Sequence, residues 1–281
     1  MLNIIHETKD IIIVNKPAGQ LSQGAKGFDL DLVSEVMTYN ASQGKPAYAA
    51  IINRLDRPVS GLVLIAKNKS AAAKYSTLMQ KEGGFNKQYE ALICGKLSEP
   101  KGTFVDYLKK DGRTNTSAIV PADDAANDDK EAKLSKLEYE VISYDEVKDI
   151  THVRIHLITG RHHQIRVQFA SRRNPLVGDY KYATADCGMD NAIKAVALKR
   201  NQIALCAVSL TIDNKTYSVT PDFAQMMSLS DVSGWIIELI CRAQFQRPTK
   251  SQFCVHFVGF FHIIQLFCVT NHLLNPVLLA I

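Results

Sequence analysis

The chain has 281 residues, of which 46% are hydrophobic and 22% charged, and its formal net charge at pH 7 is +5. This length and composition are ordinary for a folded, soluble protein and exclude a chain too polar to bury a core; one large domain or two small ones both fit. The mildly basic balance permits an anionic partner such as nucleic acid without requiring one.

The cysteines and the N-terminus indicate an intracellular protein. None of the 6 cysteines forms a C-x-x-C pair, and they are scattered in apolar contexts. This pattern indicates reduced, mostly buried thiols rather than disulfides or zinc ligands. The opening stretch, MLNIIHETKD, lacks the basic and apolar regions of a signal peptide, so we expect a cytoplasmic location.

The first half of the chain predicts buried strands and helices. Residues 10–19 contain a β-branched run closed by Lys-Pro-Ala-Gly, which predicts a strand that enters a turn. Apolar residues recur at helical spacing over 28–39, and the aliphatic run 62–67 predicts another buried strand. Residues 70–84 favour a second helix, with Ser70 as its N-cap and two glycines at its end.

The second half predicts further strands, one helix and a terminal hairpin. Strands are expected at 87–97, 136–144 and 151–158, a helix at 162–173, and a hairpin of 203–212 with 215–220. The polar stretch 111–136 is expected to be an exposed loop or excursion. Many strands, few helices and no regular βαβ rhythm favour an α+β fold with a largely antiparallel sheet.

The C-terminal part of the chain changes character. Residues 251–281 contain no Lys, Arg, Asp or Glu and are long enough to span a bilayer, but histidines and amides interrupt the apolar run. Three interpretations stay open: a tail folded on the body, a membrane-associating segment, or sequence that is not a selected part of the domain. We assign residues 1–224 to the folded domain and 225–281 to an apolar tail without an assigned role.

The stretch NRLDRPVSGLVLIAKN, residues 53–68, contains the first candidate for chemistry. An Asp in a polar turn before a strand is most often a solvated cap. Asp56, however, lies between Arg54 and Arg57, and an arginine near a carboxylate keeps it ionised. Because a nucleophile or a general base requires an ionised, positioned carboxylate, we expect Asp56 to face a cleft.

Two further stretches supply charged and aromatic candidates. In LITGRHHQIRVQFA, residues 157–170, Arg161 and Arg166 are placed to approach an anion near a helix N-terminus. We interpret the two adjacent histidines of this stretch as a surface pair rather than metal ligands, because neighbouring residues do not share a helix face. Tyr89 in KQYEALICGKL is either a half-buried strand aromatic or a flat face for a base.

Taken together and in order, these motifs resemble the RluA-type pseudouridine synthases. The resemblance rests on KDIIIVNKPAG, NRLDRPVSGLVLIAK, KQYEALICGKL, TGRHHQIRVQFA, NPLVGDYKYA and IALCAVSLTI, and it covers residues 1–224. It implies the pseudouridine synthase catalytic fold, a mixed and mainly antiparallel sheet with flanking helices around a central cleft. It also implies an enzyme that isomerises uridine to pseudouridine in ribosomal or transfer RNA, with no metal and no organic cofactor.

The resemblance implies roles for four residues in the matched motifs. Asp56 matches the catalytic aspartate, which starts the exchange of the uracil N1–C1′ bond for a C5–C1′ bond on a flipped-out base. Arg54 matches the arginine associated with opening of the RNA helix. Tyr89 matches the tyrosine that stacks on the uracil and handles the C5 proton, and Arg166 matches the basic residue that pairs with the aspartate.

Basic and polar residues near these motifs are expected to bind RNA, with a solvated surface position as the alternative for each. The predicted substrate-binding residues are Arg57, Arg161, His162 and Gln164, and further candidates for phosphate contacts are Arg172, Arg173 and Lys181. We expect RNA and not DNA as the partner, no membrane contact for residues 1–224, and a monomer.

The chain departs from the family pattern at three positions. Asn53 and Cys206 stand where the family commonly has histidine, and Val59 stands where it has threonine. Because Asn53 and Val59 flank the catalytic set, we expect an effect on substrate fit or rate. We expect no small S4-type RNA-binding domain, which some relatives carry, before Ile4, so substrate choice is expected to rest on the catalytic domain.

Three other functions compete with this one. An inactive RNA-binding descendant is disfavoured by the intact Asp56, Tyr89, Arg54 and Arg166. A membrane-associated protein would work through its apolar C-terminus, which fractionation of full-length and truncated chains would reveal. Hydrolysis by a carboxylate pair is disfavoured, because we expect no second acidic residue in the matched motifs to act as partner to Asp56.

Overall fold

The computed structural model describes residues 2–24, 30–81, 84–123, 131–183, 187–196, 198–199 and 201–223. The chain divides into two compact units, Met1–Met227 and Ser228–Ile281, and all described residues belong to the first. Among them, no helix is long and apolar enough to cross a bilayer. The predicted apolar tail lies outside the described residues, so its assignment stays a prediction.

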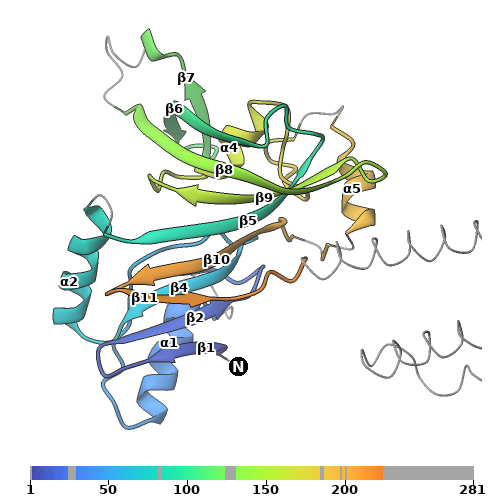
Figure 1. Cartoon of the computed structure of the whole chain (residues 1–281). Coiled ribbons are helices and arrows are strands. Elements are labelled where there is room, and N and C mark those ends of the chain that lie inside the picture. Colours follow the sequence, from blue (N-terminus) through green and yellow to red (C-terminus); the bar gives the residue numbers. More distant parts are fainter. Residues whose placement is uncertain are drawn as a thin grey trace, which may run out of the picture. The chain divides into compact units, whose positions relative to one another are not determined.

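One mixed sheet organises the described part of the chain (Figure 1). Its strands are β1 Ile4–Glu7, β2 Ile11–Lys16, β3 Ala50–Ile51, β4 Ser60–Ala66, β5 Asn86–Cys94, β6 Lys101–Asp111, β7 Thr116–Val120, β8 Lys133–Asp145, β9 Ile150–Leu157, β10 Leu205–Ile212 and β11 Lys215–Ser218. In space the order is β1-β2-β4-β10-β5-β9-β8-β6-β7, with β3 beside β4 and β11 beside β10. Every pair is antiparallel except β4 with β10, which confirms the predicted α+β fold with a mainly antiparallel sheet.

Helices cover both faces of this sheet. The helices of the described residues are α1 Leu32–Ser42, α2 Lys69–Gln80, α4 Gln164–Ala170 and α5 Met189–Ala195. Side chains alternate between the faces of a strand, so β2 directs Ile12 and Val14 to one face and Ile11 and Ile13 to the other. The first face packs against α1 and α4, and the second against α2 and α5.

The parallel contact between β4 and β10 places the segment after Asp56 against the middle of the sheet. Gly61 has φ +117°, and a Cβ atom at this position would lie 2.4 Å from the backbone N and O of Ala207. Glycine alone tolerates both this backbone conformation and this close approach. The Ser-Gly pair that follows the Asp56 turn is therefore a condition for seating β4 beside β10.

The expectation for residues 111–136 was wrong. Instead of one exposed excursion, β6 continues to Asp111, turns, and pairs with β7, while β8 begins at Lys133 and pairs with the other edge of β6. Residues 124–130 lie outside the described residues. Strands near the edge of a sheet carry many charged side chains, and these hid the end of β6 and the start of β8. The five-residue β7 has no charged residue but lies between polar stretches.

The remaining expectations concern a helix cap, several short elements and the terminal hairpin. The N-cap of α2 is Asn68, whose side chain accepts a hydrogen bond from the Ala71 backbone N, so the expectation of Ser70 was wrong. The sequence did not predict β1, β3, β6 or α5. The terminal hairpin is confirmed: Asp213 and Asn214 have φ of 45° and 60°, as a two-residue hairpin turn between β10 and β11 requires.

Candidate active site

Asp56 lies in the loop between β3 and β4, and hydrogen bonds on both sides of it hold this loop. The Ser22 hydroxyl donates to the Leu55 carbonyl at 2.6 Å and accepts from the Leu55 N–H at 3.2 Å. After Asp56, the Ile203 N–H donates to the Pro58 carbonyl at 3.1 Å. Anchored on both sides, the loop presents the Asp56 carboxylate in one position, with its side chain about one-third exposed (32%).

The buried Lys16 side chain reinforces the same loop. Its Nζ donates to the carbonyl oxygens of Pro17 at 3.0 Å, Gln20 at 2.8 Å and Arg57 at 3.4 Å. Burial lowers the pKa of Lys16 to about 8, although the charge of Asp56 opposes that shift. The turn after β2 and the Asp56 loop are therefore joined by one ammonium group.

Arg166 connects Asp56 to a second carboxylate. Its Nη1 donates to Asp56 Oδ2 at 2.9 Å, while Nε and Nη2 donate to Asp179 Oδ2 and Oδ1 at 2.6 and 2.8 Å. Burial lowers the pKa of Arg166, but the hydrogen bonds and charge of Asp179, with those of Asp56, outweigh burial and raise it. Because the bidentate pair fixes the plane of the guanidinium, the remaining donor points at Asp56 in a defined direction.

His163 is the second partner of Asp56. Its Nε2 lies 3.4 Å from Asp56 Oδ2, and its Nδ1 lies 2.6 Å from the Tyr182 hydroxyl oxygen. Burial lowers the pKa of His163 to about 3, against the opposing charge of Asp56, so the imidazole is neutral near pH 7. The His163 ring also stacks on His162, with centroids 3.8 Å apart.

Tyr89, on β5, lies near Asp56 but has apolar neighbours rather than charged ones. It is 7% exposed and packs in the apolar cluster on the α1 and α4 face. Its hydroxyl has no hydrogen-bond partner among the described residues. Burial and, to a lesser degree, the charge of Asp56 raise its pKa, so the phenol keeps its proton near neutral pH.

The structure gives the other predicted site residues different environments. Arg54 is exposed. Arg57 is exposed, and its Nε donates to the Gly19 carbonyl at 2.9 Å. Arg161 is exposed, with Nε donating to the Leu134 carbonyl at 3.0 Å. Contacts of these arginines with a substrate stay predictions.

His162 and Gln164 are engaged inside the protein. The Nδ1 of His162 lies 2.9 Å from the Ser117 hydroxyl oxygen. Gln164 is 3% exposed; its amide oxygen accepts from the Thr159 hydroxyl and the Arg161 N–H, and its amide nitrogen donates to the Lys136 carbonyl and to Gln168. The geometry of Gln164 is that of a residue that shapes the loop before α4, and its predicted contact with substrate stays a prediction.

Sequence reasoning missed three members of this centre. The interpretation of the adjacent histidines as a surface pair was wrong for His163, whose side chain is 6% exposed. It was also wrong to expect no second acidic residue in the matched motifs, because NPLVGDYKYA contains Asp179 as well as Tyr182. The sequence signal that was available is the Gly178-Asp179 pair within that motif, because such a glycine indicates a turn or a close backbone approach. In the structure, Gly178 has φ +89°, and a Cβ atom there would lie 2.4 Å from the Gln202 carbonyl oxygen.

The three departures from the family pattern have separate structural places. The Asn53 amide donates to the Leu62 carbonyl at 3.0 Å and accepts from the Leu64 N–H at 2.7 Å, so it anchors the Asp56 loop to β4. Val59 is buried on the α1 and α4 face. Cys206 is buried in the cluster that packs against α5, and burial raises its pKa to about 11. The predicted effects of Asn53 and Val59 on substrate fit stay predictions.

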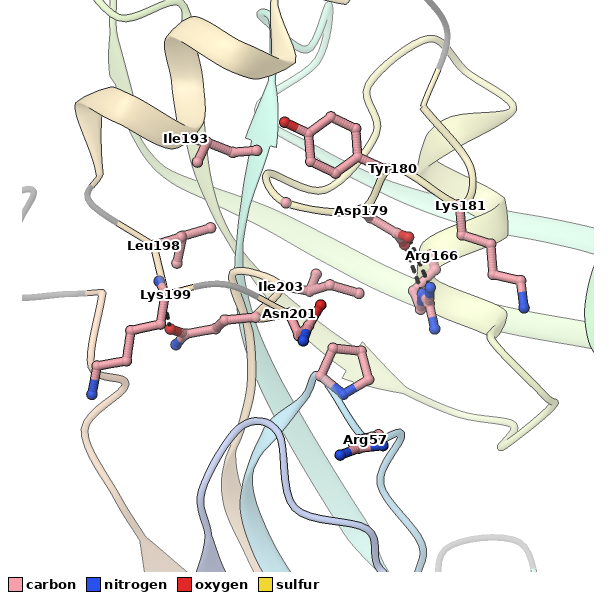
Figure 2. A pocket seen from close by; sticks show the side chains of 13 residues that line it. Arg57, Arg166, Asp179, Tyr180, Lys181, Ile193, Leu198, Lys199, Asn201 and Ile203 are labelled. Carbon is pink, nitrogen blue, oxygen red and sulfur yellow. Dashed lines mark hydrogen bonds and ion pairs between the residues drawn. The ribbon is translucent and has the colours of Figure 1, made fainter.

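A pocket of about 700 Å³ adjoins the Asp56 centre (Figure 2). Arg166, joined to Asp179, forms part of its wall, and Pro58 and Ile203 contribute apolar surface. Positively charged side chains of Arg57, Lys181 and Lys199 lie around it. A pocket with an apolar wall and a cationic rim suits a ring system that carries phosphate. Across the described ranges, no group of three or more His, Cys, Asp or Glu side chains is placed to hold a metal ion.

The comparisons with known proteins agree with one another. The sequence model of a family described as RNA pseudouridylate synthase matches residues 10–171. Ribosomal large subunit pseudouridine synthase D of Haemophilus ducreyi is 31% identical over 182 residues, 64% of this chain and 52% of that protein. The protein of the same name from Buchnera aphidicola is 33% identical over 183 residues, 65% of this chain and 55% of its own length. The chain thus spans about half the length of these curated relatives.

Two solved human structures show the same fold. RNA Pseudouridylate Synthase Domain Containing 4 superposes with a TM-score of 0.63 at 18% identity, covering 80% of this chain and 92% of that one. RNA Pseudouridylate Synthase Domain Containing 1 gives a TM-score of 0.60 at 23% identity, covering 79% and 84%. At these identities the likeness concerns the fold alone.

Proposed function

The chain belongs to the RNA pseudouridylate synthase family, and on that basis we propose that it isomerises uridine to pseudouridine in RNA. One observation carries the proposal: Asp56 lies inside the matched region, on an anchored loop, with Arg166 Nη1 2.9 Å from its Oδ2. A charged arginine 94% buried beside a partly exposed carboxylate favours the ionised acid, which the reaction requires. Two relatives are named for the large ribosomal subunit, so we propose ribosomal RNA as the substrate class.

The proposed reaction changes no atom count. The uracil N1–C1′ bond breaks, the C5–C1′ bond forms, the proton leaves C5, and N1 gains a proton. Asp56 starts the exchange on a nucleotide that has left the stack, because its target is inaccessible while the base is paired. Arg54, exposed beside Asp56, is proposed to help open the helix.

Tyr89 is proposed to receive the uracil and to handle the C5 proton. Its ring packs among apolar side chains on the same face of the sheet as α4, which supports stacking with a base. Its hydroxyl has no partner among the described residues, so substrate meets a phenol that is free to exchange a proton.

Cations around the site are proposed to hold the RNA backbone. Extruding a base costs a few kcal/mol, and phosphate contacts offset part of that cost. Arg57, Lys181 and Lys199 line the pocket beside the Asp56 centre, which supports their proposed contacts with phosphate.

A mapping experiment in cells tests the proposed function. Pseudouridine would be located by carbodiimide adducts and reverse-transcription stops in ribosomal and transfer RNA, in cells with the gene, without it, and complemented with the full-length chain or its Asp56→Ala variant. We expect at least one uridine of large-subunit ribosomal RNA to be modified with the wild-type chain and not with the variant.

Other outcomes of this mapping have distinct meanings. A dependent site in transfer RNA alone would retain the reaction and overturn the proposed substrate class. If no site depends on the gene while the purified full-length chain still binds RNA, the chain is an inactive RNA-binding descendant. Complementation by the Asp56→Ala variant would contradict the role proposed for the carboxylate.

A further inference from the structure

A chain of polar contacts runs from β7 to Asp56 through Tyr182 and His163, two side chains that sequence reasoning did not use. The Ser117 backbone N–H donates to the Tyr182 hydroxyl oxygen at 2.9 Å. That oxygen lies 2.6 Å from His163 Nδ1, and His163 Nε2 lies 3.4 Å from Asp56 Oδ2. The His163 side chain is 6% exposed, so water does not compete strongly for these contacts.

The partners of the Tyr182 hydroxyl favour one of the two imidazole tautomers of His163. A backbone N–H is only a donor, so Tyr182 accepts from Ser117. Among the described residues, His163 Nδ1 is the one other atom that hydrogen-bonds to the Tyr182 oxygen, and an acceptor there would take the hydroxyl proton. Since a neutral imidazole carries one proton, Nδ1 as acceptor leaves the hydrogen on Nε2, facing Asp56.

We propose that His163 is a positioning residue for the Asp56 carboxylate, held by Tyr182 and Ser117 as the Nε2–H tautomer. His163 Nε2 and Arg166 Nη1 both approach Oδ2 of Asp56. Among the described residues, Oδ1 receives no hydrogen bond. The two donors therefore fix the rotation of the carboxylate and leave Oδ1 as the oxygen available to the substrate. The catalytic meaning of this arrangement rests on the proposed function.

Burial keeps the His163 imidazole neutral, and nearby positive groups add to this effect. Burial lowers the pKa of His163 to about 3; the charge of Asp56 opposes the shift, and Arg166, His162 and Lys181 add to it. A neutral donor orients the carboxylate without adding a second full positive charge beside Arg166. This matters because each added cation would make the carboxylate less basic and less nucleophilic.

The backbone of His163 offers a way to separate two possible roles. His163 has φ 53°, in the left-handed region that few residues other than glycine adopt, and asparagine tolerates it better than most. An Asn side chain places its amide near the position of Nδ1, whereas a Gln side chain reaches the position of Nε2. A role limited to backbone conformation therefore favours Asn, and a role as donor to Asp56 favours Gln.

The experiment compares His163→Gln with His163→Asn in the full-length chain. Activity would be measured as tritium released from an unmodified transcript of large-subunit ribosomal RNA made with 5-tritiated uridine, because C5 loses its hydrogen in the reaction. We expect the Gln variant to keep kcat within about tenfold of wild type and the Asn variant to lose about 100-fold, with KM changed little in either. Activity of the Asn variant equal to or above that of the Gln variant would overturn the proposal.

Nitrogen NMR of the imidazole tests the tautomer without catalysis. In the full-length chain labelled with ¹⁵N-histidine, we expect His163 to show a protonated Nε2 and an unprotonated Nδ1, and Tyr182→Phe to mix the two tautomers while the ring beside Arg166 remains. A protonated Nδ1 in the wild-type chain would overturn the proposal whatever the activity. An inactive wild-type chain with a protonated Nε2 would refute the proposed function and support the tautomer.

Discussion

The two sides of Asp56 are built in opposite ways. On one side, Arg166 and His163 both contact Asp56, and each is held by a second partner, Asp179 for Arg166 and Tyr182 for His163. On the other side, Tyr89 packs among apolar side chains, and its hydroxyl has no partner within the described residues.

This difference shows which groups the protein positions in advance and which it leaves to the substrate. Donors whose own hydrogen bonds are complete do not reorganise when a reaction begins, and this is how a site stabilises charge at low cost. A hydroxyl without a partner in the protein, in contrast, is available to form a hydrogen bond when a ligand arrives. The side with Arg166 and His163 thus orients the carboxylate, and the side with Tyr89 receives the base.

The largest effect is expected from Asp56→Asn. The amide has the same shape but is neither a nucleophile nor a base, so pseudouridine formation should fall by about 10⁴-fold or more. RNA affinity should stay within about threefold, because the change touches no phosphate contact. Single-turnover tritium release and filter binding measure the two quantities. Retention of a tenth of the wild-type rate would show that the reaction does not start at the Asp56 carboxylate.

Tyr89→Phe separates the two sides of Asp56 directly. Removing this hydroxyl should lower the single-turnover rate by about 10²–10³-fold through loss of proton transfer, with a free energy of unfolding changed by less than about 0.5 kcal/mol. Tyr182→Phe is the matched control: its hydroxyl is bonded to Ser117 and His163, so unfolding should become easier by about 1 kcal/mol. Denaturant titration of both variants measures stability, and equal losses would contradict the contrast between the two sides.

Arg166→Lys tests how much the buried Arg166–Asp179 pair contributes to stability. Lysine keeps the charge but cannot bind Asp179 through two parallel N–H groups, so the free energy of unfolding should fall by about 2–3 kcal/mol. Arg172→Lys provides the control, because Arg172 also binds one carboxylate, that of Asp106, through two nitrogens but is 33% exposed. The control should lose no more than about 1 kcal/mol. Similar losses in the two variants would show that burial of Arg166 does not matter.

Acid should destabilise the protein through His163. Its folded pKa of about 3 lies below the ordinary 6.5, so the unfolded chain binds more protons as pH falls below 6.5. Stability is therefore lost from pH 6.5 down toward pH 3, by about 2 kcal/mol at pH 5. Denaturant titrations at pH 5 and pH 8 should show this loss in the wild-type chain, beyond that of the His163→Gln variant, which lacks the titrating group. Parallel pH profiles would mean that His163 is not buried in its neutral form.

The smallest effect is expected at the cationic rim of the pocket. Lys199→Ala should weaken RNA binding by less than about threefold and reduce the slope of log affinity against log salt by about 0.7, the value for one phosphate contact on single-stranded RNA. Lys101→Ala is the control, since Lys101 lies on β6, pairs with Glu140 and does not line the pocket. A salt slope that is unchanged by Lys199→Ala would remove this rim from the RNA-binding surface.

The sequence alone predicted the class of the fold and identified Asp56 as the candidate catalytic carboxylate. Runs of apolar residues predict strands, because this signal depends on neighbours along the chain. For the same reason, the ordered motifs identified the family, and they singled out Asp56, Tyr89 and Arg166.

The tertiary structure decided what surrounds the carboxylate. Asp179, Tyr182 and His163 act through contacts between segments distant in sequence, and a histidine beside another histidine shows no periodic signal of burial. The charged strand β6 and the short strand β7 were hidden for a related reason, since their pairing, rather than their composition, makes them part of the sheet. Local patterns identify the residues that form elements, whereas long-range packing determines their partners, their protons and their pKa values.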